Sequence, residues 1–169
     1  MNFDAAFSLL ISPTYEGGYS NDFNDPGGET KFGISKRSYP HLDIKSLTRE
    51  QVKPLYKKDF WGPAGCDGVP SELKYPLFDF AVNSGPETAV KTLQKRIGVV
   101  VDGHIGPITL MEISLWNPQT LALALCFDRL MFMTDLKNWP YAGKGWSRRI
   151  CSLGYQLIEV KPVKDKSWN

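Results

Sequence analysis

Four acidic residues and no basic residue lie between positions 16 and 29 of this chain: Glu16, Asp22, Asp25 and Glu29. Carboxyl groups are the side chains that cleave glycosidic bonds, because one protonates the leaving oxygen while a second stays ionised. Acids on a polar loop are more commonly just solvated. The chemistry therefore depends on which of these carboxyls the fold takes out of water.

Glu16 stands where an apolar helix is expected to end. Apolar residues recur at helical spacing from residue 3 to 11, and we expect the helix to continue to about Tyr15 and to stop at the paired glycines after Glu16. A carboxyl half-buried beside Tyr15 and Tyr19 would have a raised pKa, as a general acid requires. Asp25 follows on a polar loop, where a carboxylate stays ionised.

The stretch from Tyr19 to Gly33 is rich in glycine, asparagine and aspartate, which predicts a loop or a small hairpin. A calcium loop starting at Asp22 fails, because Pro26 and Gly33 fall where side-chain oxygen ligands are needed. A phosphate site fails as well, since no Gly-Lys-Ser/Thr follows and the local charge is negative. We therefore predict neither a metal site nor a cofactor.

Most of the remaining chain is expected to be helical. Residues 121–133 are nearly all apolar, which predicts a central buried helix. The signals for helix starts and stops are, in chain order, Thr48–Gln51, Ser71, Ser84–Gly85, Pro86, Pro107, Pro118 and Gly145–Trp146. No long alternating strand pattern occurs, so we predict a mainly α fold with a small irregular or β lobe near the N-terminus.

Several runs of the sequence resemble one known family. They are Glu16-Gly17-Gly18-Tyr19-Ser20-Asn21-Asp22, the stretch from Asn24 to Ile34, Phe60-Trp61-Gly62-Pro63, residues 77–85 and Gly145-Trp146. Together they resemble glycoside hydrolase family 108, the phage and bacterial N-acetylmuramidases with a lysozyme-like fold. The resemblance covers nearly the whole chain.

This resemblance implies roles for individual residues. Glu16 corresponds to the catalytic acid that opens the Glu-Gly-Gly-Tyr motif. The spacing also resembles the Glu-x8-Asp-x5-Thr signature of phage lysozymes, which points to Asp25 and Thr30, although only four residues separate these two. Asp22 or Glu29 could take the place of Asp25 as second carboxylate. If no second carboxylate acts, a lytic transglycosylase that uses Glu16 alone describes the chain better.

Other residues are candidates for holding the substrate. Aromatic rings stack on the apolar faces of sugars, and Tyr19 and Trp61 are the best candidates because both belong to motifs rather than to periodic helix faces. Glu29 and Asn83 are further candidate binding residues. Asp79, one helical turn before Asn83, either lines the same cleft or supports the neighbouring loop by hydrogen bonds.

A second resemblance lies in Leu93-Gln94, Asp102-Gly103 and Gly106-Pro107-Ile108-Thr109, which look like the pattern of peptidoglycan-binding modules. The same residues could serve only to turn and pack the chain. We divide the sequence into a lysozyme-like catalytic region (1–90) and a helical C-terminal region (91–169), packed into one compact domain.

The composition supports this interpretation. The chain has 169 residues, 42% of them hydrophobic, a net charge of +2 and three widely spaced cysteines. We expect no membrane insertion, no nucleic-acid binding and a monomer. We expect no signal peptide, so that a phage lysin would wait in the host cytoplasm and reach the wall through a holin.

The predicted activity is hydrolysis of the β-1,4 bond between N-acetylmuramic acid and N-acetylglucosamine in bacterial peptidoglycan. A non-catalytic wall-binding protein and a cysteine peptidase are the alternatives from other functional classes.

Overall fold

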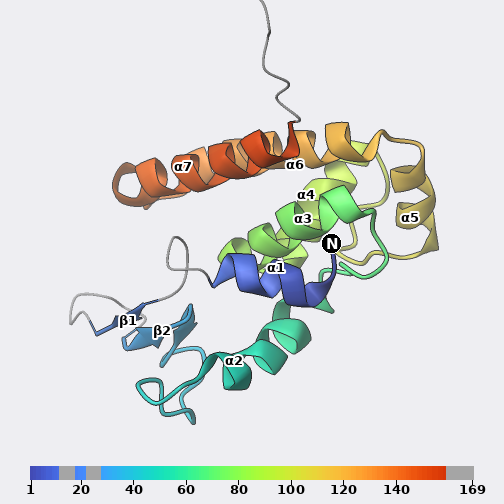
Figure 1. Cartoon of the computed structure of the whole chain (residues 1–169). Coiled ribbons are helices and arrows are strands. Elements are labelled where there is room, and N and C mark those ends of the chain that lie inside the picture. The colour runs from blue at the N-terminus through green and yellow to red at the C-terminus, as the bar shows by residue number, and fades with distance from the viewer. Residues whose placement is uncertain (12–17, 22–27, 159–169) are drawn as a thin grey trace, which may run out of the picture.

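The computed structural model describes residues 1–11, 18–21 and 28–158, and Figure 1 shows the arrangement of their helices and strands. The elements are α1 (Phe3–Leu10), β1 (Tyr19–Ser20), β2 (Thr30–Lys31), β3 (Ile34–Ser35), α2 (Arg49–Tyr56), the π-helix η1 (Lys57–Trp61), α3 (Ser71–Ser84), α4 (Pro86–Ile97), α5 (Pro107–Ser114), α6 (Pro118–Thr134) and α7 (Trp139–Leu157). The prediction of a mainly α fold with a small lobe near the N-terminus is confirmed.

Helix α1 is shorter than expected. The Asn2 side chain caps its start by accepting a hydrogen bond from the Ala5 amide at 2.9 Å, and Ile11 ends it. The expected end near Tyr15 is wrong because Pro13 follows: proline has no N–H for the helix ladder, and it disfavours helical backbone in the residue before it. The chain between Ile11 and Gly18 lies outside the described residues.

The small lobe is a three-stranded antiparallel sheet in the order β1-β2-β3. Tyr19 pairs with Lys31, and Thr30 pairs with Ser20 on one side and Ser35 on the other. Phe32 and Gly33 connect β2 to β3 with φ angles of +50° and +74°. Two residues with positive φ are typical of a tight hairpin turn, and at Phe32 this conformation is strained because the side chain is not glycine.

In Figure 1, α6 and α7 run across the top of the molecule and α3 and α4 lie beneath them. Helix α3 packs on α4 and α6, and α6 packs on α7. Pro86, Pro107 and Pro118 lie in first turns, as predicted. The last helix begins at Trp139 rather than after Gly145–Trp146. Gly143 permits this, since a Cβ there would lie 2.7 Å from the Trp139 ring.

The predicted boundary between regions 1–90 and 91–169 falls within α4, which runs from Pro86 to Ile97. Helices of both regions contact one another, α3 with α6 above all. The division into a catalytic and a wall-binding region stays a prediction.

One buried ionic cluster joins three of these helices. Asp79 of α3 is 1% exposed, and its carboxylate accepts hydrogen bonds from Arg129 of α6 at 2.5 Å and from Arg149 of α7 at 2.6 Å. Burial alone would raise the pKa of Asp79, but the two guanidinium groups outweigh burial and lower it. The cluster therefore holds a charged carboxylate inside the protein.

We predict that Asp79→Ala lowers the free energy of unfolding by about 3–5 kcal/mol, because it leaves the buried guanidinium of Arg129 and the partly buried guanidinium of Arg149 without their carboxylate. The exposed Asp135→Ala is the matched control, with an effect within about 0.5 kcal/mol. Urea unfolding measures both. Since the folded-state pKa of Asp79 is lowered, its stabilisation is present above the ordinary aspartate pKa and is lost as the pH falls through the folded-state value. An Asp79→Asn protein whose stability fell as steeply with acid as the parent would contradict this assignment.

Candidate active site

The predicted catalytic carboxyls Glu16 and Asp25, and the alternative Asp22, lie outside the described residues. The structure does describe Thr30, Glu29 and Tyr19. These three residues are brought together by the antiparallel pairing of β1 with β2. They define the described part of the candidate site.

A hydrogen bond crosses this hairpin. The Tyr19 hydroxyl donates to Glu29 Oε1 at 3.0 Å, and the side chain of Tyr19 is 42% exposed. The bond keeps the phenolic proton next to a carboxylate, so it raises the pKa of Tyr19. Glu29 is half-buried. The hairpin thus presents one fixed carboxylate and one accessible aromatic ring.

Thr30 lies on β2 with its side chain half-buried. Its hydroxyl donates to the Gly28 carbonyl at 3.3 Å. With the proton directed at this carbonyl, the lone pairs of the hydroxyl oxygen are left to accept. Thr30 is therefore set up as a hydrogen-bond acceptor, the role expected of a group that orients a water molecule.

Two tyrosines hold the lobe in place. Tyr56 at the end of α2 donates its hydroxyl to the carbonyl of the strained Phe32 at 2.7 Å. Tyr39 donates to Asp59 of η1, also at 2.7 Å, and burial and the bond to this carboxylate both raise the pKa of Tyr39. Both anchors come from beyond the hairpin, so α2 and η1 determine where Glu29 and Thr30 lie.

The interpretation of Trp61 as a stacking platform is wrong. Its side chain is 0% exposed, its ring packs edge-on against Phe3 and Phe78, and its Nε1 donates to Asp67 at 2.8 Å. A sugar ring cannot reach it. A tryptophan whose N–H and ring faces are all used internally is a core residue, although it belongs to a family motif.

Asn83 is exposed at the end of α3, where it accepts a hydrogen bond from the Ser84 hydroxyl at 3.1 Å. It shares no hydrogen bond with the hairpin in the part of the chain that the structure describes. Its role in binding stays a prediction. Asp79, one turn earlier, supports the fold rather than lining a cleft, because its carboxylate is buried between Arg129 and Arg149.

Arg129 and Arg149 were missed as partners of Asp79. The available signal was Arg129, the one basic residue in the mostly apolar stretch 121–133, whose other charged residue is Asp128. A buried guanidinium requires a carboxylate partner, and the sequence of α3 offers Asp79 near its middle. The pairing of Arg149 with the same carboxylate has no comparable local signal.

The second motif builds a loop. Gln94 is fully buried and donates to Asp102 Oδ1 at 2.7 Å and to the His104 carbonyl at 2.9 Å. The Gly103 amide donates to Gln94 Oε1 at 2.8 Å. This network explains the spacing of Gln94, Asp102 and Gly103 structurally. Wall binding by this region stays a prediction.

Among residues 1–11, 18–21 and 28–158, no three His, Cys, Asp or Glu side chains gather as a metal site would require. Within the same residues, no helix combines the length and the hydropathy that crossing a membrane takes.

Helices around a buried core, with a three-stranded lobe at one side, define the lysozyme-like class of fold. The family profile described as Glycosyl hydrolase 108 matches residues 13–85. The solved structure of Brucella abortus SagA is 30% identical with a TM-score of 0.79, and the match covers 91% of this chain and 94% of that one. None of the curated proteins matches the sequence.

The chain belongs to glycosyl hydrolase family 108. It is a glycoside hydrolase, and membership of this family supports peptidoglycan as the material on which it acts.

We predict that Glu29→Gln lowers the pKa of Tyr19 towards its ordinary value. The reason is that the substitution removes the carboxylate beside the phenolic proton. Ultraviolet titration of the tyrosines, compared with a Tyr19→Phe background, measures the change. Glu50→Gln, an exposed glutamate at the start of α2, is the control and should leave the Tyr19 pKa as it was. An unshifted Tyr19 in Glu29→Gln would mean that the cross-hairpin bond does not form.

We also predict that Gln94→Leu lowers the free energy of unfolding by about 2–3 kcal/mol, because the buried Gly103 amide loses its acceptor. Gln156→Leu is the matched control on an exposed position of α7, with an effect within about 0.5 kcal/mol. Thermal and urea unfolding distinguish the two. Equal, small losses would show that the network contributes nothing to the fold.

Proposed function

We propose that the chain hydrolyses the β-1,4 bond between N-acetylmuramic acid and N-acetylglucosamine in peptidoglycan, as an N-acetylmuramidase of the endolysin type. The observation that carries the proposal is the family match over residues 13–85, which includes Glu16, Asp25 and Thr30. The placement of Thr30 and Glu29 on one anchored hairpin supports it.

In this proposal Glu16 is the general acid. Its carboxyl protonates the oxygen that leaves as the glycosidic bond breaks, while positive charge develops on the neighbouring sugar carbon. Asp25 stabilises that charge or activates the attacking water, and Thr30 orients the water by accepting a hydrogen bond from it. The bond is then cleaved with addition of one water across it.

Glu29 is the strongest alternative to Asp25 as second carboxylate. Tyr19 holds one of its oxygens, Oε1, and Oε2 has no hydrogen-bond partner among the described residues. A carboxylate oriented in this way can accept a proton from water. Asp22 is the third possibility, and comparison of the three amide variants decides among them.

We further propose that Tyr19 stacks on a sugar ring and that Asn83 contributes a hydrogen bond to the glycan. The protein would act as a monomer. It would collect in the host cytoplasm and reach the periplasmic wall after a holin opens the inner membrane. Whether the C-terminal region also binds the wall is a separate part of the proposal, tested by sedimentation with purified peptidoglycan.

We predict that Glu16→Gln reduces the release of reducing ends from purified peptidoglycan by about 10²- to 10⁴-fold, since an amide cannot give up a proton. The melting temperature should stay close to that of the parent protein. Glu50→Gln is the control, a glutamate of α2 that should retain full activity. Full activity in Glu16→Gln would overturn the proposal.

Mass spectrometry of the fragments completes this experiment. Hydrolysis adds water and leaves reducing muramic acid ends, whereas a lytic transglycosylase leaves anhydro ends. Anhydro ends would show that the chain is a lytic transglycosylase that uses the same acid, and not a hydrolase. Sedimentation with the wall without any new ends would indicate a binding protein, and freed amino groups would indicate a peptidase.

A further inference from the structure

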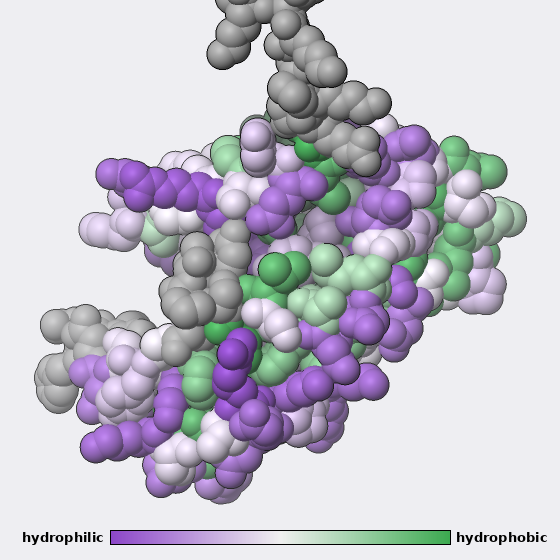
Figure 2. Space-filling model, viewed as in Figure 1, coloured by the Kyte–Doolittle hydropathy of each residue, from purple (hydrophilic) through white to green (hydrophobic). Residues whose placement is uncertain are grey.

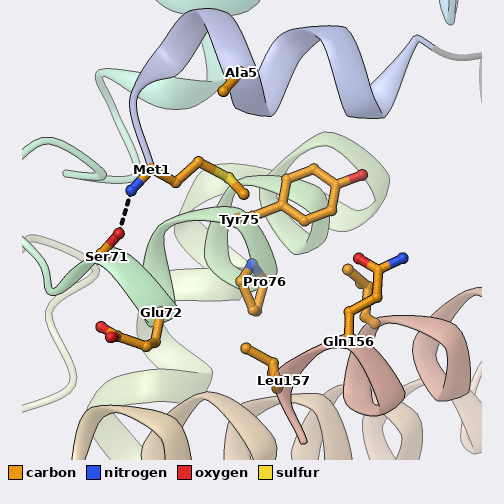
Figure 3. A pocket seen from close by; sticks show the side chains of 9 residues that line it. Met1, Ala5, Ser71, Glu72, Tyr75, Pro76, Gln156 and Leu157 are labelled. Carbon is orange, nitrogen blue, oxygen red and sulfur yellow. Dashed lines mark hydrogen bonds between the residues drawn. The ribbon is translucent and has the colours of Figure 1, made fainter. Parts of the chain in front are cut away.

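A cavity of about 440 Å³ opens between α1, α3 and α7 (Figure 3). Ala5 of α1 borders it on one side, and Leu153 and Gln156 of α7 on the other. Its floor is made by Tyr75 and Pro76 of α3. Figure 2 shows apolar residues gathered on this face of the molecule, between α1 and the upper helices. The interior of the cavity is therefore apolar.

The cavity continues a line of residues along α3. Tyr75, Asp79 and Asn83 follow one another at intervals of one helical turn, and on α7 Gln156, Leu153 and Arg149 do the same in the opposite direction. Tyr75 and Asn83 are thus about 12 Å apart along the helix axis. That separation is on the scale of a short peptide. The ionic cluster of Asp79, Arg129 and Arg149 fills the interior between the two ends, so only a substrate that runs over the surface of this cluster can reach both.

Two polar side chains lie at the rim of the cavity. Glu72 is exposed at one edge and Gln156 at the other, and neither side chain has a hydrogen-bond or ion-pair partner among the described residues. A carboxylate at the edge of an apolar cavity favours an aliphatic chain that ends in an ammonium group. The amide of Gln156 both donates and accepts, as a peptide bond requires.

We propose that this cavity binds the short peptide attached to the muramic acid residue of the wall. The aliphatic part of its diamino acid lies on Pro76 and Leu153, and the terminal amine pairs with Glu72. The amide of Gln156 bonds to the peptide backbone. This proposal rests on the proposed function and adds to it: the enzyme recognises peptide-bearing glycan over bare glycan.

The test compares two substrates, intact peptidoglycan and glycan strands from which an amidase has removed the peptides. Ala5→Phe fills the cavity from an exposed helix position. We expect it to lower the ratio of kcat/KM for intact wall over kcat/KM for peptide-free glycan by about tenfold. The matched control is Ser114→Phe, exposed on α5, which contributes no residue to the cavity. This control should keep the ratio of the parent protein.

A second experiment tests whether the amine of the peptide pairs with Glu72. Acetylation of the free amines of the wall should lower kcat/KM of the parent protein by about three- to fivefold, as expected for one partly exposed ion pair. Glu72→Gln should show the same loss on unmodified wall and no further loss on acetylated wall. An equal response of both proteins to acetylation would overturn the placement of the amine at Glu72.

Three other outcomes would refute the proposal. An unchanged substrate ratio in Ala5→Phe refutes peptide binding in the cavity. If Ala5→Phe instead lowers the oligomeric mass, the cavity is an interface between copies and the proposal is wrong. If Trp168→Ala raises the ratio in the full chain, the C-terminal segment is the occupant, which also refutes it. Failure of the proposed function itself looks different: the parent protein would release no new ends from either substrate.

Discussion

The architecture depends on one buried carboxylate. Asp79 can lie at 1% exposure only because Arg129 and Arg149 replace the water that it loses, and each guanidinium in turn needs this carboxylate. The hydrogen-bond geometry tolerates little displacement, so α3, α6 and α7 must pack in one register. The ionic cluster therefore contributes specificity of packing beyond the burial of surface area.

The position of the small lobe depends on how α3 packs. Phe78 precedes Asp79 on α3 and packs against Trp61, which ends η1. Tyr56, immediately before η1, holds the Phe32 carbonyl in the strained turn that joins β2 to β3. A displacement of α3 would thus be passed through two aromatic contacts to the hairpin that carries Glu29 and Thr30. Helical core and candidate site are mechanically one unit.

The sequence predicted the features of the fold that depend only on residues close together in the chain. Pro86, Pro107 and Pro118 begin helices because proline fits a first turn, whatever surrounds it. The sequence did not predict the features that depend on contacts between residues far apart in the chain. The burial of Trp61 depends on Phe3 and Phe78, and the start of α7 depends on how closely the Trp139 ring lies on Gly143. For the site, the turn-rich stretch from Tyr19 to Gly33 predicted a loop or a small hairpin, and β1 and β2 form there because a hairpin is a local structure. The pattern left the role of Asp79 open.

Membership of a motif does not by itself distinguish catalysis from support. Trp61, Asp79 and Gln94 all belong to motifs, and each has its polar atoms bonded inside the protein. Tyr19, Glu29 and Thr30 belong to a motif too, yet they lie on the surface lobe with oxygen atoms that can still accept hydrogen bonds. A group whose bonding capacity is used internally cannot act on a substrate without breaking the fold. The groups with capacity left over are therefore the ones in which chemistry can reside, and Tyr19, Glu29 and Thr30 on the hairpin are among them.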